Sequence, residues 1–169
     1  MPNNDFSTTN LAASDVMEDT PTNNYCTLNP LAMAGQTLSE GNLKAVESGA
    51  SSGHWQARGT FLIPTTGKWY WETLLTAVGS GSNVMIGVVK PTHASFSDAW
   101  YGTSDGWCFD FYGGSPYPVK KRSSAVTTDT DINWSTGTVY RVALDMDANK
   151  IWFGDDGGWA DSGNPATET

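Results

Sequence analysis

The chain has 169 residues, of which 38% are hydrophobic and 16% are charged. This length and composition suit one folded domain with a substantial core and exclude a disordered chain. The net charge of −9 argues against a nucleic-acid partner, because phosphate binding needs clustered Lys and Arg.

The start of the chain carries no basic segment followed by an apolar one, so we expect no secretory signal. No run of about 18 apolar residues occurs, which predicts no membrane insertion. We therefore expect a product made in the host cytoplasm. Cys26 and Cys108 are not spaced as a zinc or redox motif. Cys108 lies in an apolar strand pattern that predicts a buried thiol, and a disulfide with Cys26 stays open.

Residues 1–24 are polar and aperiodic, which predicts an extended N-terminal arm before a domain over residues 25–169. From there short segments alternate with turn signals, the pattern of an all-β fold. A weak strand is expected over residues 42–46 and a stronger one over residues 57–63. Helical periodicity is almost absent.

The clearest strand covers residues 68–76, with the sequence KWYWETLLT. Alternation places Trp69 and Trp71 on one face and Tyr70 and Leu74 on the other. Both faces carry bulky side chains, which predicts a strand inside a sandwich.

Further strands are predicted over residues 84–89, 107–112, 139–146 and 149–154, the last two forming a hairpin. Gly87 interrupts the first of these, which indicates a bulge or a close approach of two backbones.

Two long irregular stretches separate these strands, at residues 90–106 and 116–131. Loops of this length in a compact domain are usually either functional or flexible. The basic run of residues 120–122 is interpreted as a solvated loop or a guard on an edge strand.

The candidate binding residues are loop aromatics with neighbouring acids. An aromatic ring can cover the C–H face of a sugar while polar groups bind its hydroxyls. The competing interpretation is that each ring fills an end of the sandwich. The candidates are Trp100, Tyr101, Asp98, Asp105, Tyr117, Trp134 and Trp159.

The sequence predicts no catalytic residues. Glycan hydrolysis needs two carboxyl groups about 5 to 9.5 Å apart. Only Asp145 and Asp147 have the spacing for this, and they are predicted to form the turn of the hairpin.

No cofactor is expected, with structural Ca²⁺ as a minor alternative. Asp145, Asp147 and Asn149 are spaced like the start of a calcium-binding loop. Lys150 stands where that loop needs a glycine, and Asp and Asn are also common turn formers.

Three segments in order resemble the SPRY domain family: GKWYWET at 67–73, IGVV at 86–89 and GTVYRVALDMDANKIWF at 137–153. The family is a bent sandwich used for binding, without common catalytic residues. The resemblance implies a non-enzymatic, two-layer antiparallel β-sandwich of the concanavalin-like, jelly-roll type.

A narrower resemblance, to bacteriophage and prophage tail proteins, is carried by DVMEDTPTNNYCTLNPL at 15–31 and IWFGDDGGWADSGNP at 151–165. It implies a virion structural protein of a tail fibre or similar appendage. Such a protein would be multivalent or homo-oligomeric, and its loops would bind a host-surface glycan or protein or another virion protein. The alternatives are a capsid decoration protein, a SPRY protein–protein interaction module and, disfavoured, a glycan hydrolase.

SPRY-like domains normally continue with one or more strands after the last hairpin, whereas here a polar tail runs to Thr169. The resemblance therefore implies that the final strand is missing or that a neighbouring subunit supplies it by β-augmentation.

Overall fold

The computed structural model describes residues 25–47, 55–78, 83–97, 104–112, 119–122, 125–128, 132 and 135–169, and in 83, 112, 119–122 and 125–128 only the backbone. Two compact units divide the chain. The first unit is 1–62 with 94–98, and the second is 63–93 with 99–169. The predicted arm over residues 1–24 lies outside the described residues.

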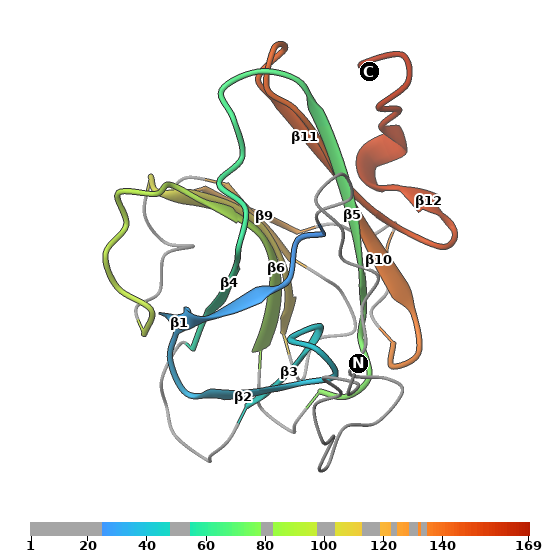
Figure 1. Cartoon of the computed structure of the whole chain (residues 1–169). Helices are drawn as coiled ribbons and strands as arrows, with labels where there is room; N and C mark the ends of the chain where they lie inside the picture. The colour runs from blue at the N-terminus through green and yellow to red at the C-terminus, as the bar shows by residue number, and fades with distance from the viewer. Residues whose placement is uncertain are drawn as a thin grey trace, which may run out of the picture. The chain divides into compact units, whose positions relative to one another are not determined.

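The first unit contains two short antiparallel pairs of strands (Figure 1). Strand β1 (Leu28–Met33) pairs with β4 (Ala57–Gly59), with a shift in register. Strand β2 (Gln36–Ser39) pairs in regular register with β3 (Lys44–Glu47). The strand expected at 42–46 therefore corresponds to β3, which begins two residues later. The strand expected at 57–63 corresponds to β4, which is shorter.

An arginine ties residues 94–97 to β4 within this unit. The guanidinium of Arg58 lies 4.4 Å from the ring centroid of Phe96 and donates to the carbonyl oxygen of Ser95 at 2.8 Å. A cation over an aromatic face adds a specific attraction to the hydrogen bond. These contacts fix the part of the 90–106 stretch that the structure assigns to the first unit.

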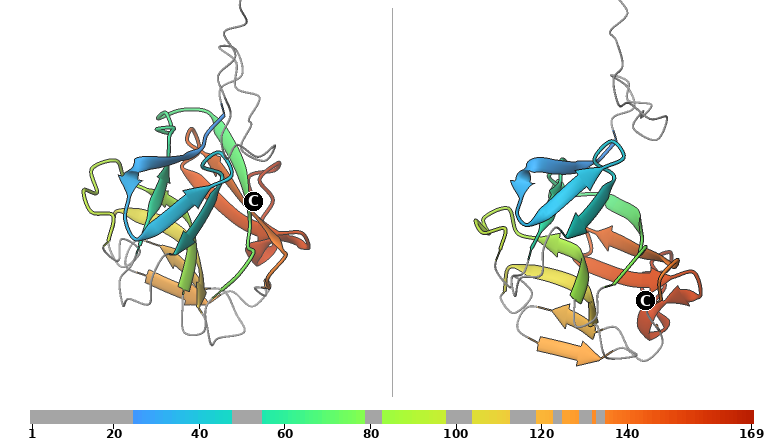
Figure 2. Two further views of the ribbon diagram at one scale, coloured as in Figure 1. Left: turned by 60° about the horizontal axis from the view of Figure 1, so that its bottom comes forward. Right: turned by 90° about the horizontal axis from the view of Figure 1, so that it is seen from below.

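The second unit contains two four-stranded antiparallel sheets (Figure 2). One sheet has the order β12-β11-β10-β5 and the other β6-β7-β8-β9. The first consists of β5 (Lys68–Leu74), β10 (Val139–Asp145), β11 (Lys150–Asp155) and β12 (Gly158–Trp159). The second consists of β6 (Asn83–Val89), β7 (Gly106–Tyr112), β8 (Val119–Arg122) and β9 (Ala125–Thr128). A 3-10 turn, η3 (Ala160–Ser162), follows β12.

The hydrophobic core lies between these sheets. The ring of Phe109 on β7 stacks on that of Phe153 on β11, with centroids 5.3 Å apart and planes within 5°. Phe111 packs against Tyr140 of β10 at 4.3 Å. Rings from both layers thus interdigitate as in a sandwich core. The predicted all-β, two-layer antiparallel sandwich is confirmed.

Strands β6 and β7 approach each other closely at Gly87. A Cβ added there would lie 2.1 Å from the carbonyl oxygen of Trp107 and 2.7 Å from the Cα of Cys108. The predicted close backbone approach is confirmed, and the register of the pair is continuous, without a bulge. Cys108 is fully buried as expected, Cys26 is exposed, and neither is in a disulfide.

The stretch at residues 116–131 is not irregular throughout, as its composition had indicated. It contains β8 and β9, which pair with each other, while β8 also pairs with β7. The basic run of residues 120–122 therefore belongs to an inner strand of its sheet and not to a loop. Pairing with the aromatic strand β7 outweighs the weak local preference of Lys and Arg for strands.

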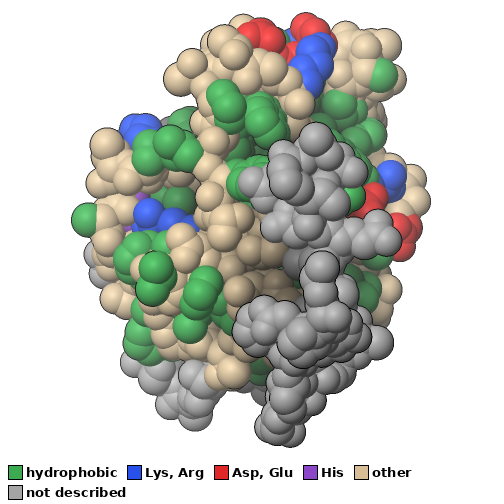
Figure 3. Space-filling model, viewed as in Figure 1, with side chains coloured by type: hydrophobic (Ala, Val, Ile, Leu, Met, Phe, Trp, Pro, Cys, Tyr) green, Lys and Arg blue, Asp and Glu red, His purple; other side chains and the backbone are tan. Residues whose placement is uncertain are grey.

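Charged side chains are sparse on the face in Figure 3, where hydrophobic side chains are scattered among polar atoms. Several large apolar side chains are exposed, Leu31 the most, at 91%. In the part of the chain that the structure describes, no helix has the length and apolar character to cross a membrane.

Candidate functional site

The outer face of the β12-β11-β10-β5 sheet carries a row of aromatic side chains, of which one is exposed and two are partly buried. Along β5 the residues alternate strictly, with Trp69 and Trp71 partly buried and Tyr70, Glu72 and Leu74 exposed. Tyr70 is 54% exposed. The strand belongs to the sandwich as predicted, and of its two bulky faces only the Trp71 side packs against the core.

The strand register brings two of these rings to either side of a small residue. Ala143 of β10 pairs with Tyr70 of β5 on one side and with Trp152 of β11 on the other. Side chains directly opposite in an antiparallel sheet lie on the same face and in contact range. Because Ala143 has only a methyl group, the sheet is hollowed between the phenol and the indole.

A third ring, that of Trp159, lies on this face because a glycine leaves room for it. Trp159 of β12 pairs with Gly154 of β11, one row beyond Ala143. A Cβ at Gly154 would lie 3.0 Å from the Trp159 ring and 2.4 Å from the carbonyl oxygen of Gly158. The absence of a side chain at Gly154 thus lets the indole lie directly against the sheet.

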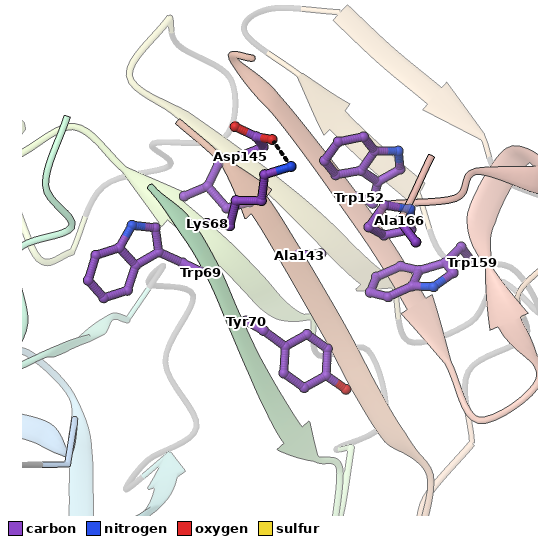
Figure 4. A pocket seen from close by; sticks show the side chains of 10 residues that line it. Lys68, Trp69, Tyr70, Ala143, Asp145, Trp152, Trp159 and Ala166 are labelled. Atoms are coloured by element: carbon purple, nitrogen blue, oxygen red, sulfur yellow. Dashed lines mark ion pairs between the residues drawn. The ribbon is translucent and has the colours of Figure 1, made fainter. Parts of the chain in front are cut away.

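Together these side chains form an open depression of about 300 Å³, here called the aromatic groove (Figure 4). The rings of Tyr70 and Trp159 meet edge to face, with centroids 6.5 Å apart. Trp69 points to the opposite side of β5 from Tyr70 in Figure 4. The groove is lined by Tyr70, Ala143, Trp152 and Trp159 together with Pro165 and Ala166, and its end by Lys68 and Asp145.

One end of the groove is closed by an ion pair. Lys68 Nζ lies 2.9 Å from Asp145 Oδ2, and Asp145 Oδ1 accepts the backbone N–H groups of Asp147 and Ala148 at 3.0 and 2.9 Å. The N–H of Ala148, followed by Lys68, lowers the pKa of Asp145. The hydrogen bond to Asp145 in turn raises the pKa of Lys68. Both groups are therefore charged at neutral pH.

The other end combines a phenol, a carboxylate and a guanidinium. The hydroxyl of Tyr70 donates to Glu72 Oε1 at 2.5 Å, and Arg141 lies 5.7 Å from the ring centroid of Trp159. Desolvation and then the bond to Glu72 raise the pKa of Tyr70 above its ordinary value, so the phenol stays protonated. The groove thus has an apolar middle and ends with both signs of charge.

Of the predicted binding residues, Trp159 lines the aromatic groove and Asp105 does not. Asp105 Oδ2 lies 3.2 Å from His93 Nδ1, and its Oδ1 lies 3.7 Å from Lys90 Nζ. Asp105 therefore braces the two ends of its own loop. The other candidates lie outside the described residues: Asp98, Trp100, Tyr101, Tyr117 and Trp134.

Sequence reasoning missed Tyr70 and Trp152 as site residues. Trp152 stands between Ile151 and Phe153, both of which face the core, so alternation alone places its indole on the outer face. Alternation thus carries this signal, whereas the candidate residues were sought among the aromatics of the loops.

Asp145 and Asp147, the acids with the spacing of a hydrolase pair, both accept structural backbone hydrogen bonds, Asp145 within the hairpin turn and Asp147 from the residue before β5. Asp145 binds the N–H groups named above, and Asp147 Oδ2 accepts the N–H of Gly67 at 3.2 Å. Asn149 has a φ of 54°, as tight turns require. Across the described ranges, no three His, Cys, Asp or Glu side chains gather as a group that could hold a metal ion. A second run with the same spacing, Asp129, Asp131 and Asn133, lies outside the described residues.

Comparison with protein families gives a match to the SPRY domain over residues 68–163, which is more than half of the chain. This range begins with β5 and ends just after η3, so it includes every strand that forms the aromatic groove. A search of curated proteins gives no match. The matched range and the antiparallel sandwich agree, and the chain belongs to the SPRY domain family.

Proposed function

We propose that this chain is a non-enzymatic interaction module that binds a protein partner through the aromatic groove. Membership of the SPRY family supports the first half, since SPRY domains are generally protein-interaction modules and not enzymes. The observation that supports the second half is the row of the exposed Tyr70 and the partly buried Trp152 and Trp159 that lines the groove on the outer face of the sheet.

The chemistry of the groove suits a segment of another protein. Aromatic side chains and Arg are enriched where partners bind most strongly, because they bury much area and lose little rotamer freedom. Tyr70 offers a phenol beside Glu72, and Arg141 offers a guanidinium beside Trp159. An apolar side chain of the partner would fill the hollow over Ala143, and its polar groups would bind at the two ends.

The test is selection from a peptide-display library with the full chain, followed by affinity measurement for selected peptides. Tyr70→Ala removes an exposed ring without opening the core, and we expect it to weaken binding at least about tenfold, as at other central aromatic contacts. Tyr25→Ala is the matched control, since Tyr25 is a 50% exposed tyrosine of the first unit. Equal affinities of the two variants would exclude the groove as the binding surface.

A glycan ligand is the second candidate, because an aromatic groove with the polar groups of Glu72 and Arg141 at one end also suits a sugar ring. A glycan array probed with the same two variants separates the candidates. Glycan binding that Tyr70→Ala abolishes, in the absence of any selected peptide, would replace the protein partner by a carbohydrate.

The virion role stays a prediction that depends on the resemblance of residues 15–31 and 151–165 to tail proteins. Immunogold electron microscopy of particles from the source tests it. Label on tail fibres or tips would support an adhesion role, label on the capsid would support decoration, and unlabelled particles would contradict both.

A further inference from the structure

The residues after η3 lie along one side of the aromatic groove. Trp152 Nε1 donates to the carbonyl oxygen of Thr169 at 2.7 Å, and Lys150 Nζ donates to the carbonyl oxygen of Glu168. Lys68 Nζ pairs with the carboxylate of Glu168 at 3.0 Å. Residues 164–169, with the sequence NPATET, are here called the tail segment.

The tail segment forms one wall of the groove, through contacts that a bound peptide could also make. Pro165 and Ala166 line the groove, and Figure 4 shows Ala166 near Trp152 and Trp159. The Thr169 carbonyl oxygen accepts from the indole N–H of Trp152, and the Glu168 carboxylate pairs with Lys68. Gly163 lets the chain enter this path, since a Cβ there would lie 2.9 Å from the Trp152 ring. The glycine thus allows the backbone to pass close to the Trp152 ring just before the tail segment begins.

Charge at this end of the groove favours an acidic occupant. Lys68 and Lys150 bring two ammonium groups, while Asp145 brings one buried carboxylate. Glu168 supplies the second negative charge. If the tail segment leaves, the groove keeps an unbalanced positive charge beside an indole N–H that needs an acceptor.

The tail segment is attached lightly. Its residues are exposed except for the half-buried Pro165. Its shape is held by its own hydrogen bonds, from Asn164 N–H to the Thr169 carbonyl at 2.8 Å and from Ala166 N–H to Asn164 Oδ1 at 3.0 Å. It also lies beyond residue 163, where the match to the SPRY domain ends. Displacing it therefore removes no part of the sandwich.

We propose that the tail segment is an internal stand-in for the partner, and that the aromatic groove binds an acidic peptide that adopts a similar turn, with small apolar residues before its carboxylate. This inference rests on the proposed function and specifies the class of partner. In this arrangement the partner's carboxylate replaces Glu168 on Lys68, and a backbone carbonyl of the partner replaces that of Thr169 on Trp152. The tail segment competes with the partner and sets a threshold for its binding.

The test adds the tail segment in trans, so that it needs no knowledge of the natural partner. A labelled peptide NPATET is titrated into the full chain and into Glu168→Gln, which loses the carboxylate on Lys68. We expect the peptide to bind Glu168→Gln at least about tenfold more tightly than the unchanged chain, and NPATQT to bind both more weakly. The indole N–H resonance of Trp152, assigned with Trp152→Phe, should shift in the Glu168→Gln variant and shift back as the peptide is added.

Glu40→Gln is the matched control, because Glu40 pairs with Lys44 at 3.0 Å in an equally exposed ion pair of the first unit. It should bind the peptide no better than the unchanged chain.

A variant ending at Gly163 is a second test, with its fold checked by the dispersion of its amide resonances. If the folded Glu168→Gln and shortened chains both fail to bind NPATET, the inference is overturned. If library peptides still bind in a way that depends on Tyr70, the proposed function survives this failure. If NPATET binds but no library peptide does, the tail segment has its site in the groove, and the proposal that the groove binds a separate protein partner is overturned.

Discussion

Lys68 and Asp145 form an ion pair at 2.9 Å across neighbouring strands, and Asp145 is at the same time the cap of the hairpin turn that follows it. The pair joins the start of β5 to the end of β10 and closes one end of the aromatic groove. A single buried carboxylate thus links the turn, the strand pairing and the site.

Asp145→Asn should destabilise the chain in a pH-dependent way. The pKa of Asp145 is lowered from 3.8, so the unfolded chain binds its proton first as the pH falls. The stabilisation is therefore complete above about pH 4 and is lost as the pH falls through the folded pKa. The pKa of Lys68 is raised from 10.5, so its contribution is complete below that pH and is lost as the pH rises through the folded value.

Urea unfolding followed by tryptophan fluorescence checks this over a series of pH values. The difference in unfolding free energy between the unchanged chain and Asp145→Asn should be largest near neutral pH and should shrink on acidification. Asp145→Asn should also cost less in a Lys68→Gln background, because the partner charge is already gone. A difference that stays constant down to about pH 2 would contradict the assigned ion pair.

The stack of Phe109 on Phe153 should be the strongest single contact between the two sheets. Phe153→Ala removes a buried ring and should lower the unfolding free energy by about 3–5 kcal/mol. The milder changes Phe109→Leu and Phe153→Leu allow a double-mutant cycle, in which we expect a coupling of about 0.5–1.5 kcal/mol. Denaturant unfolding measures both quantities.

Phe61→Leu is the control for this cycle, since Phe61 is 41% exposed in the first unit. Its effect should stay within about 0.5 kcal/mol, as for most surface substitutions. Additive effects of the two core changes would show that the rings do not interact as the sandwich requires.

The strands predicted best are those whose pattern is strong without help from the rest of the fold. Alternation in β5 and β10, the apolar run of β6 and the turn after Asp145 are all readable in a short window. Strands β8 and β9 are not, because Lys, Arg and Thr dominate them and their stability comes from pairing with β7.

The site was harder to predict than the strands. Tyr70 and Trp152 are 82 positions apart in the numbering, and they meet only because Ala143 aligns with both. No local sequence pattern determines the register between β5 and β10, so the row of rings could not be predicted from the sequence. Trp159, predicted as a ligand-binding loop aromatic, lines the groove, although its ring lies against the sheet and not in a loop.

Asp105→Ala should loosen a loop and leave partner binding unchanged. Asp105 bonds to His93, whose side chain is 10% exposed, and pairs more distantly with Lys90. Losing these contacts should lower the unfolding free energy by about 1 kcal/mol, the usual value for one hydrogen bond with a partly exposed ion pair. Hydrogen exchange at the Lys90 amide, which bonds to the Asp105 carbonyl at 2.6 Å, should become faster.

Ser104→Ala is the control, because it alters an exposed neighbour outside this cluster. If Asp105→Ala instead abolishes binding of a selected peptide or glycan without changing stability or exchange, the ligand role predicted from the sequence is correct and the bracing role is wrong.

Gly87→Ala should be the most damaging of the small substitutions. The new methyl group would lie 2.1 Å from a backbone oxygen of β7, and no side-chain rotation relieves a clash with backbone. Overpacking of cores typically costs about 1–3 kcal/mol, and we expect a cost of at least about 3 kcal/mol here because the two strands must move apart. Soluble yield and urea unfolding measure the loss.

Gly157→Ala is the matched control for this change. The nearest atom to its new methyl group is Asp155 Oδ1 at 3.1 Å, the end of a side chain that can rotate away. We expect a cost below about 1 kcal/mol, within the range of ordinary surface changes. If Gly87→Ala unfolds at the same urea concentration as Gly157→Ala, then β6 and β7 are farther apart than described. The packing of Phe109 and Phe111, which β7 carries into the core, would then have to be different as well.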